Sequence, residues 1–233
     1  MNLILLHPED FISTSRAVLK DRRRDHIHSV LSAKVGDELC VGLLNAKIGT
    51  GKVVKTGREI VLDVALTRTS PQPLPLKLIV PMIRPPMFKR LLFHATTLGI
   101  KDIIILNFSR VEKSLWQSSA LRPEVVLEQL VLGLEQAKDT VLPQITLRRQ
   151  FKPFIEGELP ALAEGTDKIV ADPSGQAKFT GGGKPLTLVI GPEGGFIPYE
   201  LEELASIGFK AVNLGARILR VDTALPYIIG KLF

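Results

Sequence analysis

The sequence predicts an α/β protein in two parts: a small N-terminal β-barrel over residues 1–70, and an α/β domain over residues 76–233 with a mostly parallel sheet. Three observations support this prediction. Before residue 70, short strand-like runs are separated by glycine turns, which is typical of small barrels. Three prolines then fall within Ser70–Pro75, so residues 71–75 are expected to form an extended linker. Beyond the linker, buried strands alternate with longer helices, the pattern of a parallel sheet.

The N-terminal part contains four strand-like runs and one short helix. Turn-forming residues separate the runs, notably Gly36-Asp37, Asn45 and Thr56-Gly57. The expected strands are Asn2–Leu6, Glu38–Leu44, Ala46–Val54 and Glu59–Leu66. The expected helix is Arg24–Ser32.

In the C-terminal part, short continuous apolar runs predict buried strands, and prolines mark helix starts. The expected strands are Leu76–Ile83, Asp102–Leu106, Asp167–Ala171, Leu186–Ile190 and Lys210–Leu214. The expected helices are Met87–Leu98, Pro123–Lys138, Pro153–Ala163, a segment that begins at Pro198, and Asp222–Leu232. The acidic residues Glu200, Glu202 and Glu203 follow Pro198, and acidic side chains in a first turn favour a helix.

Composition narrows the class of protein. A length of 233 residues suits one large domain, or a small one with a medium one. The formal net charge of +6 and the isoelectric point near 9.5 indicate a polyanionic partner. The single cysteine, Cys40, excludes an internal disulfide and fits a reducing compartment. Neither a signal peptide nor a membrane span is expected, so we expect a soluble, cytoplasmic protein.

Two glycine-marked stretches, Val189–Phe196 and Leu214–Thr223, each begin where an apolar strand stops. Their glycines let the backbone come close to a bound molecule. Loops at the same ends of neighbouring parallel strands would form one crevice, where open α/β sheets bind ligands. Asp172, in the polar turn after another strand, is expected to form a third wall. The alternative, a tight turn without a ligand, is less favoured because Arg217 and Arg220 lie in the second stretch.

Basic residues form two groups that are candidates for contact with RNA phosphates. The first group, before the expected N-terminal helix, is Lys20, Arg22, Arg23 and Arg24. The second group, which follows two strands of the expected parallel sheet, is Arg84, Lys89, Arg90, Arg110 and Lys113. The alternative for both groups is an ordinary solvated surface, and in the first group Asp21 and Asp25 would neutralise part of the charge.

Three further patterns are weaker. Gly181–Lys184 suggests a phosphate loop, but Pro185 follows the lysine and no strand precedes it. His26 and His28 are two residues apart on a helix and face different directions, so no metal site is expected. Trp116, in a polar loop, could stack on a base or act as a half-buried anchor.

The segments Ile190–Gly195, Leu214–Arg220 and Thr223-Ala224 together resemble the RsmE family of SPOUT-class methyltransferases, which methylate N3 of a uridine in 16S ribosomal RNA. The resemblance is weaker elsewhere but extends along most of the chain. It implies a trefoil-knotted α/β fold that binds S-adenosylmethionine in the knot, and a PUA-like RNA-binding barrel at the N-terminus. It also implies a homodimer, 16S ribosomal RNA or the small ribosomal subunit as partner, and no metal.

The resemblance also implies roles for individual residues. The cofactor-binding residues would be Asp172, Ile190, Gly191, Glu193, Gly194, Gly195, Leu214, Gly215, Ile218 and Leu219. Methylation of uracil N3 requires loss of its proton, and a guanidinium would stabilise the charge that develops on the ring oxygens. Arg220 is the first candidate for this role and Arg217 the second. Asp222 is a candidate for a catalytic carboxylate or a helix cap, and no histidine stands out as a general base.

Three departures from the family pattern lie on the substrate side. Asp222 stands where the family usually has Glu, His94 and Thr97 replace Lys and Glu, and Lys138-Asp139 replaces Gly-Arg. Two alternatives therefore stay open beside the 16S enzyme: a non-catalytic RNA-binding protein with the same fold, and a related methyltransferase that acts on another RNA, such as transfer RNA.

Overall fold

The computed structural model describes residues 1–176 and 185–233, which form two compact units. One unit is Met1–Gln72 with Leu130–Leu142, and the other is Pro73–Gln129 with Pro143–Phe233. Helix α3 (Pro123–Ala137) begins in the second unit and ends in the first. This differs from the expected division at the linker, because Val131 and Leu134 of α3 pack against Leu3 and Leu5 of the N-terminal unit. Gly181–Lys184, where the sequence argues against a phosphate loop, lies outside the described residues.

The N-terminal unit contains a six-stranded sheet with the strand order β1-β4-β5-β6-β3-β2. The strands are β1 (Ile4–Leu6), β2 (Phe11–Ser13), β3 (Arg16–Leu19), β4 (Glu38–Leu43), β5 (Ile48–Lys55) and β6 (Ile60–Arg68). All pairs are antiparallel except β1–β4. Helix α1 (Arg22–Ser29) starts two residues earlier than expected, because the Asp21 side chain caps it by accepting a hydrogen bond from the Arg23 N–H.

The second unit contains a parallel sheet with the strand order β12-β10-β11-β7-β8-β9. The strands are β7 (Leu76–Pro81), β8 (Asp102–Leu106), β9 (Gln144–Arg148), β10 (Asp167–Ala171), β11 (Leu186–Ile190) and β12 (Lys210–Val212). The central strand β11 is buried at every position, including Thr187, as its mostly apolar run predicts. The predicted α/β fold with a mostly parallel sheet is confirmed. Strand β9 was not predicted, because polar residues interrupt its apolar pattern.

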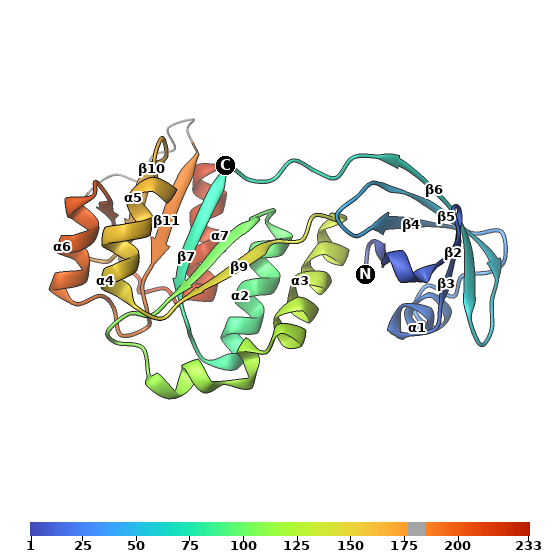
Figure 1. The fold of residues 1–233 in the computed structure, drawn as a ribbon, viewed down its shortest axis with the longest axis horizontal. Helices are drawn as coiled ribbons and strands as arrows, with labels where there is room; N and C mark the ends of the chain where they lie inside the picture. Colours follow the sequence, from blue (N-terminus) through green and yellow to red (C-terminus); the bar gives the residue numbers. More distant parts are fainter. Residues whose placement is uncertain (177–184) are drawn as a thin grey trace. The chain divides into compact units, whose positions relative to one another are not determined.

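Helices cover both faces of this parallel sheet. Figure 1 shows α4 (Phe151–Pro153), α5 (Leu159–Leu162) and α6 (Pro198–Ser206) on one side, and α2 (Pro85–Thr97) and α7 (Val221–Leu232) on the other. The predicted helix Pro153–Ala163 is instead a broken one, in which a π-helical turn, Phe154–Glu158, separates α4 from α5. Pro160, in α5, has no N–H to complete the regular hydrogen-bond ladder.

Because the strands are parallel, all their carboxyl ends lie at one edge of the sheet. The loops after β8, β10, β11 and β12 therefore open on the same edge. The loop after β8 includes two short 3-10 turns, η2 (Lys113–Gln117) and η3 (Ser119–Leu121). This edge is the place where open α/β sheets bind their ligands.

Candidate active site

A cavity of ≈ 260 Å³ lies at the carboxyl edge of the parallel sheet. Its walls come from the loops after β10, β11 and β12 and from the first turn of α7. All the residues predicted to bind the cofactor line it: Asp172, Ile190, Gly191, Glu193, Gly194, Gly195, Leu214, Gly215, Ile218 and Leu219. Local sequence patterns in separate segments therefore converge on one site.

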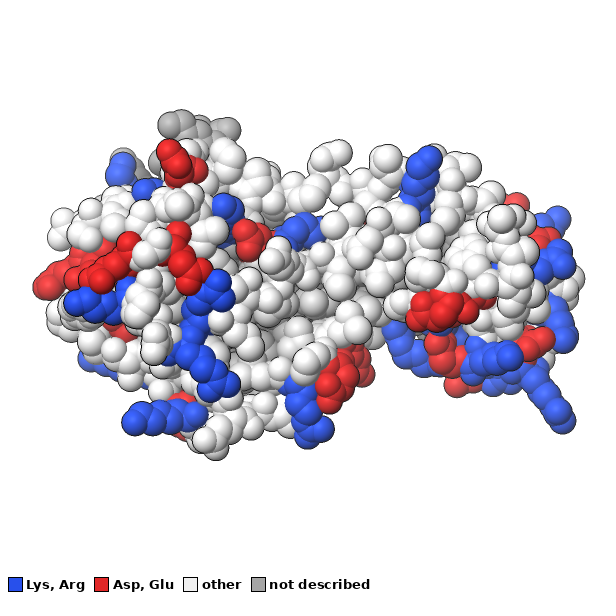
Figure 2. Space-filling view, viewed as in Figure 1, with Lys and Arg blue, Asp and Glu red and all other residues white. Residues whose placement is uncertain are grey.

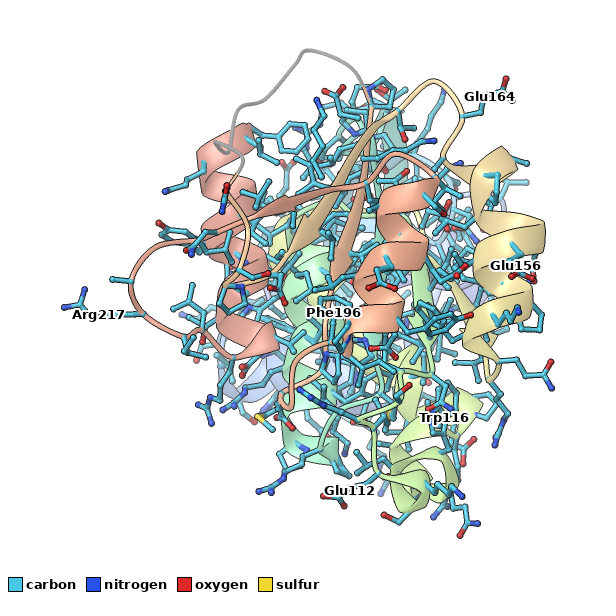
Figure 3. All side chains as sticks on the ribbon, turned by 90° about the vertical axis from the view of Figure 1, so that its left-hand side faces the viewer. Glu112, Trp116, Glu156, Glu164, Phe196 and Arg217 are labelled. Atoms are coloured by element: carbon cyan, nitrogen blue, oxygen red, sulfur yellow. The ribbon has the colours of Figure 1, made fainter. Side chains whose placement is uncertain are left out.

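The loop after β11 needs its glycines for two physical reasons. A Cβ at Gly191 would lie 2.5 Å from Cε2 of Phe196, so the backbone at Gly191 lies directly against that buried ring. Figure 3 shows Phe196 in the interior of this unit, between the ribbons. Gly195 has a φ of +72°, a left-handed conformation that side-chain-bearing residues rarely adopt. The glycines therefore set the shape of the cavity wall.

Asn213 connects the loop after β12 to the loop after β10. Its Nδ2 donates to the carbonyl of Pro173 at 2.5 Å, and its Oδ1 accepts from the Gly215 N–H at 2.7 Å. Gly215 has a φ of +123°. The sequence pattern alone does not point to Asn213. The available signal was an amide residue just after a strand and two residues before a loop glycine.

A buried carboxylate, Glu200 of α6, holds the base of the glycine loop. It is fully buried and accepts two backbone hydrogen bonds, from the Ser109 N–H at 2.7 Å and the Ile197 N–H at 3.0 Å. From the sequence, Glu200 is expected only to favour a helix start. Its link to Ser109, in the loop after β8, depends on tertiary structure.

Of the three predicted catalytic residues, Asp222 and Arg220 lie close together, whereas the side chain of Arg217 lies elsewhere. Asp222, in the first turn of α7, is buried, and its Oδ2 accepts a 2.8 Å hydrogen bond from Nη2 of Arg90. Nε of Arg220 lies 4.0 Å from Oδ1 of Asp222, so two arginines converge on one carboxylate. Arg217 lines the cavity, but Figure 3 shows its side chain extending away from the body of the protein.

The second predicted basic group follows β7 and β8, at the carboxyl edge of the parallel sheet. Arg84 and Lys113 are exposed, and Lys89 is half-buried. Arg110 is exposed too, but its Nη1 donates to the carbonyl of Gly194 at 2.6 Å. Arg90, also predicted to lie on the rim, forms an ion pair with Asp222. Of these residues, Arg84 and Lys113 have the most freedom to bind a phosphate.

The first predicted basic group is mostly engaged inside the N-terminal unit. Arg23 is only 6% exposed and pairs with Asp10 at 2.6 Å and Asp21 at 2.7 Å, so the prediction that it contacts RNA is corrected. Arg22 makes two 3.0 Å hydrogen bonds to the buried Glu135. Lys20 is largely exposed, with Glu59 at 3.7 Å. Figure 2 likewise shows basic and acidic side chains intermixed on the viewed face of this unit.

The ion pairs of Arg23 shift the pKa values of Arg23 and Asp21. Burial lowers the pKa of the Arg23 guanidinium, but hydrogen bonds to Asp21 and Asp10 outweigh that effect and raise the pKa above its usual value. The hydrogen bond from Arg23 lowers the pKa of the Asp21 carboxyl. Arg23 therefore joins η1 (Pro8–Asp10) to the start of α1.

Trp116 is an anchor of the loop after β8. It is 7% exposed, and its Nε1 donates to Oδ1 of Asn107 at 2.7 Å. The guanidinium of Arg149 lies over the indole ring, 5.2 Å from its centroid. Of the two alternatives for Trp116, these contacts favour the anchor, because little of the ring is accessible to a base.

Within residues 1–176 and 185–233, no group of three or more metal-ligating side chains occurs. In the same residues, no helix is long and apolar enough to cross a membrane.

The fold and the cavity define an α/β domain with a ligand pocket at the carboxyl edge of its parallel sheet. Comparison with known families identifies the class of protein to which this domain belongs. Residues 70–232 match the family model described as an RNA methyltransferase domain, and the chain belongs to that family.

Curated relatives share most of this length. Ribosomal RNA small subunit methyltransferase E of Treponema pallidum is 28% identical over 232 residues, which cover 96% of this chain and 87% of the relative. Ribosomal RNA small subunit methyltransferase E 1 of Borreliella burgdorferi is 25% identical over 232 residues, 96% of this chain and 94% of the relative. The predicted resemblance to the RsmE family is confirmed.

Solved structures show a similar fold. The Neisseria gonorrhoeae ribosomal RNA small subunit methyltransferase E bound to S-adenosyl methionine has a TM-score of 0.76 at 20% identity, covering 99% of this chain and 95% of that one. A methyltransferase from Legionella pneumophila in complex with the cofactor SAM has a TM-score of 0.71 at 19% identity, covering 98% of this chain and 95% of that one.

Proposed function

We propose that this protein transfers a methyl group from S-adenosylmethionine to N3 of a uridine in 16S ribosomal RNA. The observation that carries the proposal is the cavity at the carboxyl edge, which every predicted cofactor residue lines. Family membership supports RNA as the substrate class. The relatives named ribosomal RNA small subunit methyltransferase E support the 16S molecule.

The residues of the cavity fit an adenosine-containing sulfonium cofactor. Glycine backbone at positions 191, 194 and 195 leaves room for close approach, and Leu214 and Leu219 offer apolar surface to a purine ring. The Neisseria gonorrhoeae and Legionella pneumophila structures with a similar fold contain this cofactor. When bound, S-adenosylmethionine supplies an electrophilic methyl group on a positively charged sulfur.

Methyl transfer to a nitrogen is an in-line displacement, so the protein contributes mainly through positioning. Uracil N3 becomes nucleophilic when its proton leaves and negative charge spreads to the ring oxygens. In the proposed function, Arg220 stabilises that charge, because it follows the cofactor loop and precedes α7 directly. Arg217 is the weaker candidate, since its side chain extends away from the protein.

The proposal includes four features of architecture and location. They are a trefoil knot in the C-terminal unit, a PUA-like barrel in the N-terminal unit, a homodimer, and action in the cytoplasm on an assembled small ribosomal subunit rather than naked RNA.

Support for the knot comes from the path of the chain. After the edge strand β12, the chain passes Pro173, which Asn213 contacts, and returns as α7 to pack on α2 and β11.

Mass spectrometry of ribosomal RNA nucleosides from a deletion strain tests the proposal. We expect 3-methyluridine to disappear from 16S ribosomal RNA and to return with the wild-type gene. We expect no return with a gene that encodes Arg220→Ala. Loss of a methylated nucleoside from transfer RNA instead would support the alternative of another RNA substrate. No change in any methylated nucleoside would support the non-catalytic RNA-binding alternative.

A further inference from the structure

Asp222 is a buried carboxylate with only one of its two oxygens hydrogen-bonded. The side chain is 8% exposed, and Oδ2 accepts the 2.8 Å hydrogen bond from Arg90 of α2. Oδ1 is buried and has no hydrogen-bond partner among the described residues. Buried polar atoms nearly always have a partner, and leaving one without costs free energy. Oδ1 is therefore an acceptor that the described residues leave unused.

The place of Asp222 in the fold connects this oxygen to the proposed reaction. Its neighbours Val221 and Ala224, in the same turn of α7, line the cofactor cavity. Arg220, whose side chain is 65% exposed, brings its Nε to within 4.0 Å of Oδ1. An acceptor without a partner among the described residues thus lies beside an exposed donor, and next in sequence to the cavity-lining Val221.

This arrangement matches one edge of a uracil ring. Uracil presents the N3–H donor between two carbonyl acceptors. A carboxylate oxygen can accept the N3–H while a neighbouring guanidinium donates to an adjacent carbonyl. The pair Asp222 and Arg220 offers that combination, whereas two arginines alone would leave the N3 proton without an acceptor.

The carboxylates that line the cavity suit this role less well. Oδ1 of Asp172 already accepts hydrogen bonds from the N–H and the hydroxyl of Ser174, at 2.8 Å and 2.5 Å. Glu193 is exposed, so water satisfies its oxygens. Asp222 combines burial, a free oxygen and a neighbouring arginine.

We propose that Asp222 is the general base that removes the N3 proton, with Arg90 as the positioning residue that fixes its other oxygen; this rests on the proposed function. The N3 proton passes to Oδ1, and the N3 electron pair forms a bond to the methyl carbon of S-adenosylmethionine. The carbon–sulfur bond breaks and its electron pair stays on sulfur, which becomes a neutral thioether. The proton then leaves Asp222 for water, so one proton is released for each methyl group transferred.

The test combines Asp222→Asn with a more acidic substrate. Small ribosomal subunits are purified from two cultures of a strain that lacks this methyltransferase, one grown with 5-fluorouracil and one without. Fluorine at C5 withdraws electrons and makes N3–H more acidic, so the base is needed less. On ordinary subunits, we expect Asp222→Asn to lower the single-turnover rate by about 100-fold or more. On fluorinated subunits, we expect that loss to shrink by at least about tenfold.

Matched variants separate chemistry from folding. Asp222→Asn should bind S-adenosylmethionine with unchanged affinity in calorimetry, and Asp222→Glu, which keeps a carboxylate, should restore part of the rate. Asp102→Asn is the control, because Asp102 begins β8 at the opposite edge of the sheet and should leave the rate unchanged. Full turnover in Asp222→Asn, or an equal loss on both substrates, would overturn the role of Asp222. Failure of the wild-type protein to methylate either substrate would instead overturn the proposed function.

Discussion

The guanidinium of Arg110 donates a 2.6 Å hydrogen bond to the carbonyl of Gly194, across 84 residues of sequence. This contact joins the loop after β8 to the glycine loop after β11. Glu200 reinforces the same junction, since it accepts hydrogen bonds from Ser109 and Ile197. The rim that faces the proposed RNA and the wall of the proposed cofactor pocket are therefore parts of one connected structure.

Gly195→Asp should abolish binding of S-adenosylmethionine. A side chain and a negative charge would enter the cavity wall, and the residue would have to keep the left-handed φ of +72°. Gly165→Asp is a matched control, because Gly165 has a φ of +69° and precedes β10 at the opposite edge of the sheet. Calorimetry should find no binding for the first variant and normal affinity for the second. Normal affinity for Gly195→Asp would disprove the site assignment.

Glu200→Gln should weaken the glycine loop. One of the two backbone N–H groups would then face an amide NH₂ in place of an oxygen, and a lost buried hydrogen bond costs about 1–3 kcal/mol. Denaturant unfolding should show that loss, together with weaker binding of S-adenosylmethionine. Glu202→Gln, on the exposed side of the same helix, should change neither property. Equal behaviour of the two variants would argue against the proposed support of the loop.

Arg23→Ala should destabilise the N-terminal unit strongly. The substitution leaves the carboxylate of Asp10, whose side chain is only 9% exposed, without its ion-pair partner, and breaking a buried ion pair costs about 3–5 kcal/mol. Arg24→Ala removes a more exposed pair with Asp25 and should cost less. Denaturant unfolding compares them directly. A small effect of Arg23→Ala would mean that the guanidinium is not a structural element.

A lower pH should reduce the free energy of unfolding that the pair of Arg23 and Asp21 contributes. The folded-state pKa of Asp21 is lowered, so the stability it contributes is present above its unfolded pKa of about 4. That contribution is lost as the pH falls through the lower folded-state pKa. Unfolding free energies measured from neutral pH downwards should therefore decrease below about pH 4. In Arg23→Ala this part of the decrease should be smaller, and an unchanged pH profile would contradict the assigned pair.

Replacement of Arg84 and Lys113 by alanine should weaken RNA binding and reduce its dependence on salt. Each lost phosphate contact reduces the salt slope by about one. Lys210→Ala is the control, because Lys210 begins β12 at the opposite edge of the sheet. Binding to small ribosomal subunits over a series of salt concentrations gives the slopes. An unchanged slope in the double variant would exclude this rim from the RNA interface.

Replacement of Tyr227 and Phe233 by glutamate should yield a monomer, if the C-terminal helix α7 forms the proposed dimer interface. Tyr227 of α7 and Phe233, which directly follows the helix, are 38% and 57% exposed, although most other apolar residues of the helix are buried. Tyr199→Glu, at a similarly exposed tyrosine on α6, should leave the dimer intact. Light scattering at micromolar concentration measures the mass. A monomeric wild-type protein would refute the proposed dimer.

The sequence predicted those parts of the fold and site that depend on local pattern. Continuous apolar runs located β11 and most of the parallel sheet, whereas the polar residues of β9 concealed that strand. The glycines that follow β11 and β12 correctly predicted the position of the cavity. The pairing of Arg90 with Asp222 spans 132 residues and could not be predicted, because it depends on how α2 packs against α7. The burial of Arg23 was missed for a similar reason, since Asp10 is distant in sequence.

Methyl transfer by the purified protein tests the central claim most directly. Small ribosomal subunits from a strain that lacks this enzyme are incubated with the protein and S-adenosylmethionine that carries a deuterated methyl group. Mass spectrometry then identifies the labelled nucleoside in digested 16S ribosomal RNA. We predict deuterated 3-methyluridine from assembled subunits, and none with naked 16S ribosomal RNA or with Gly195→Asp. Absence of label from the subunits, or label in a nucleoside other than uridine, would contradict the account.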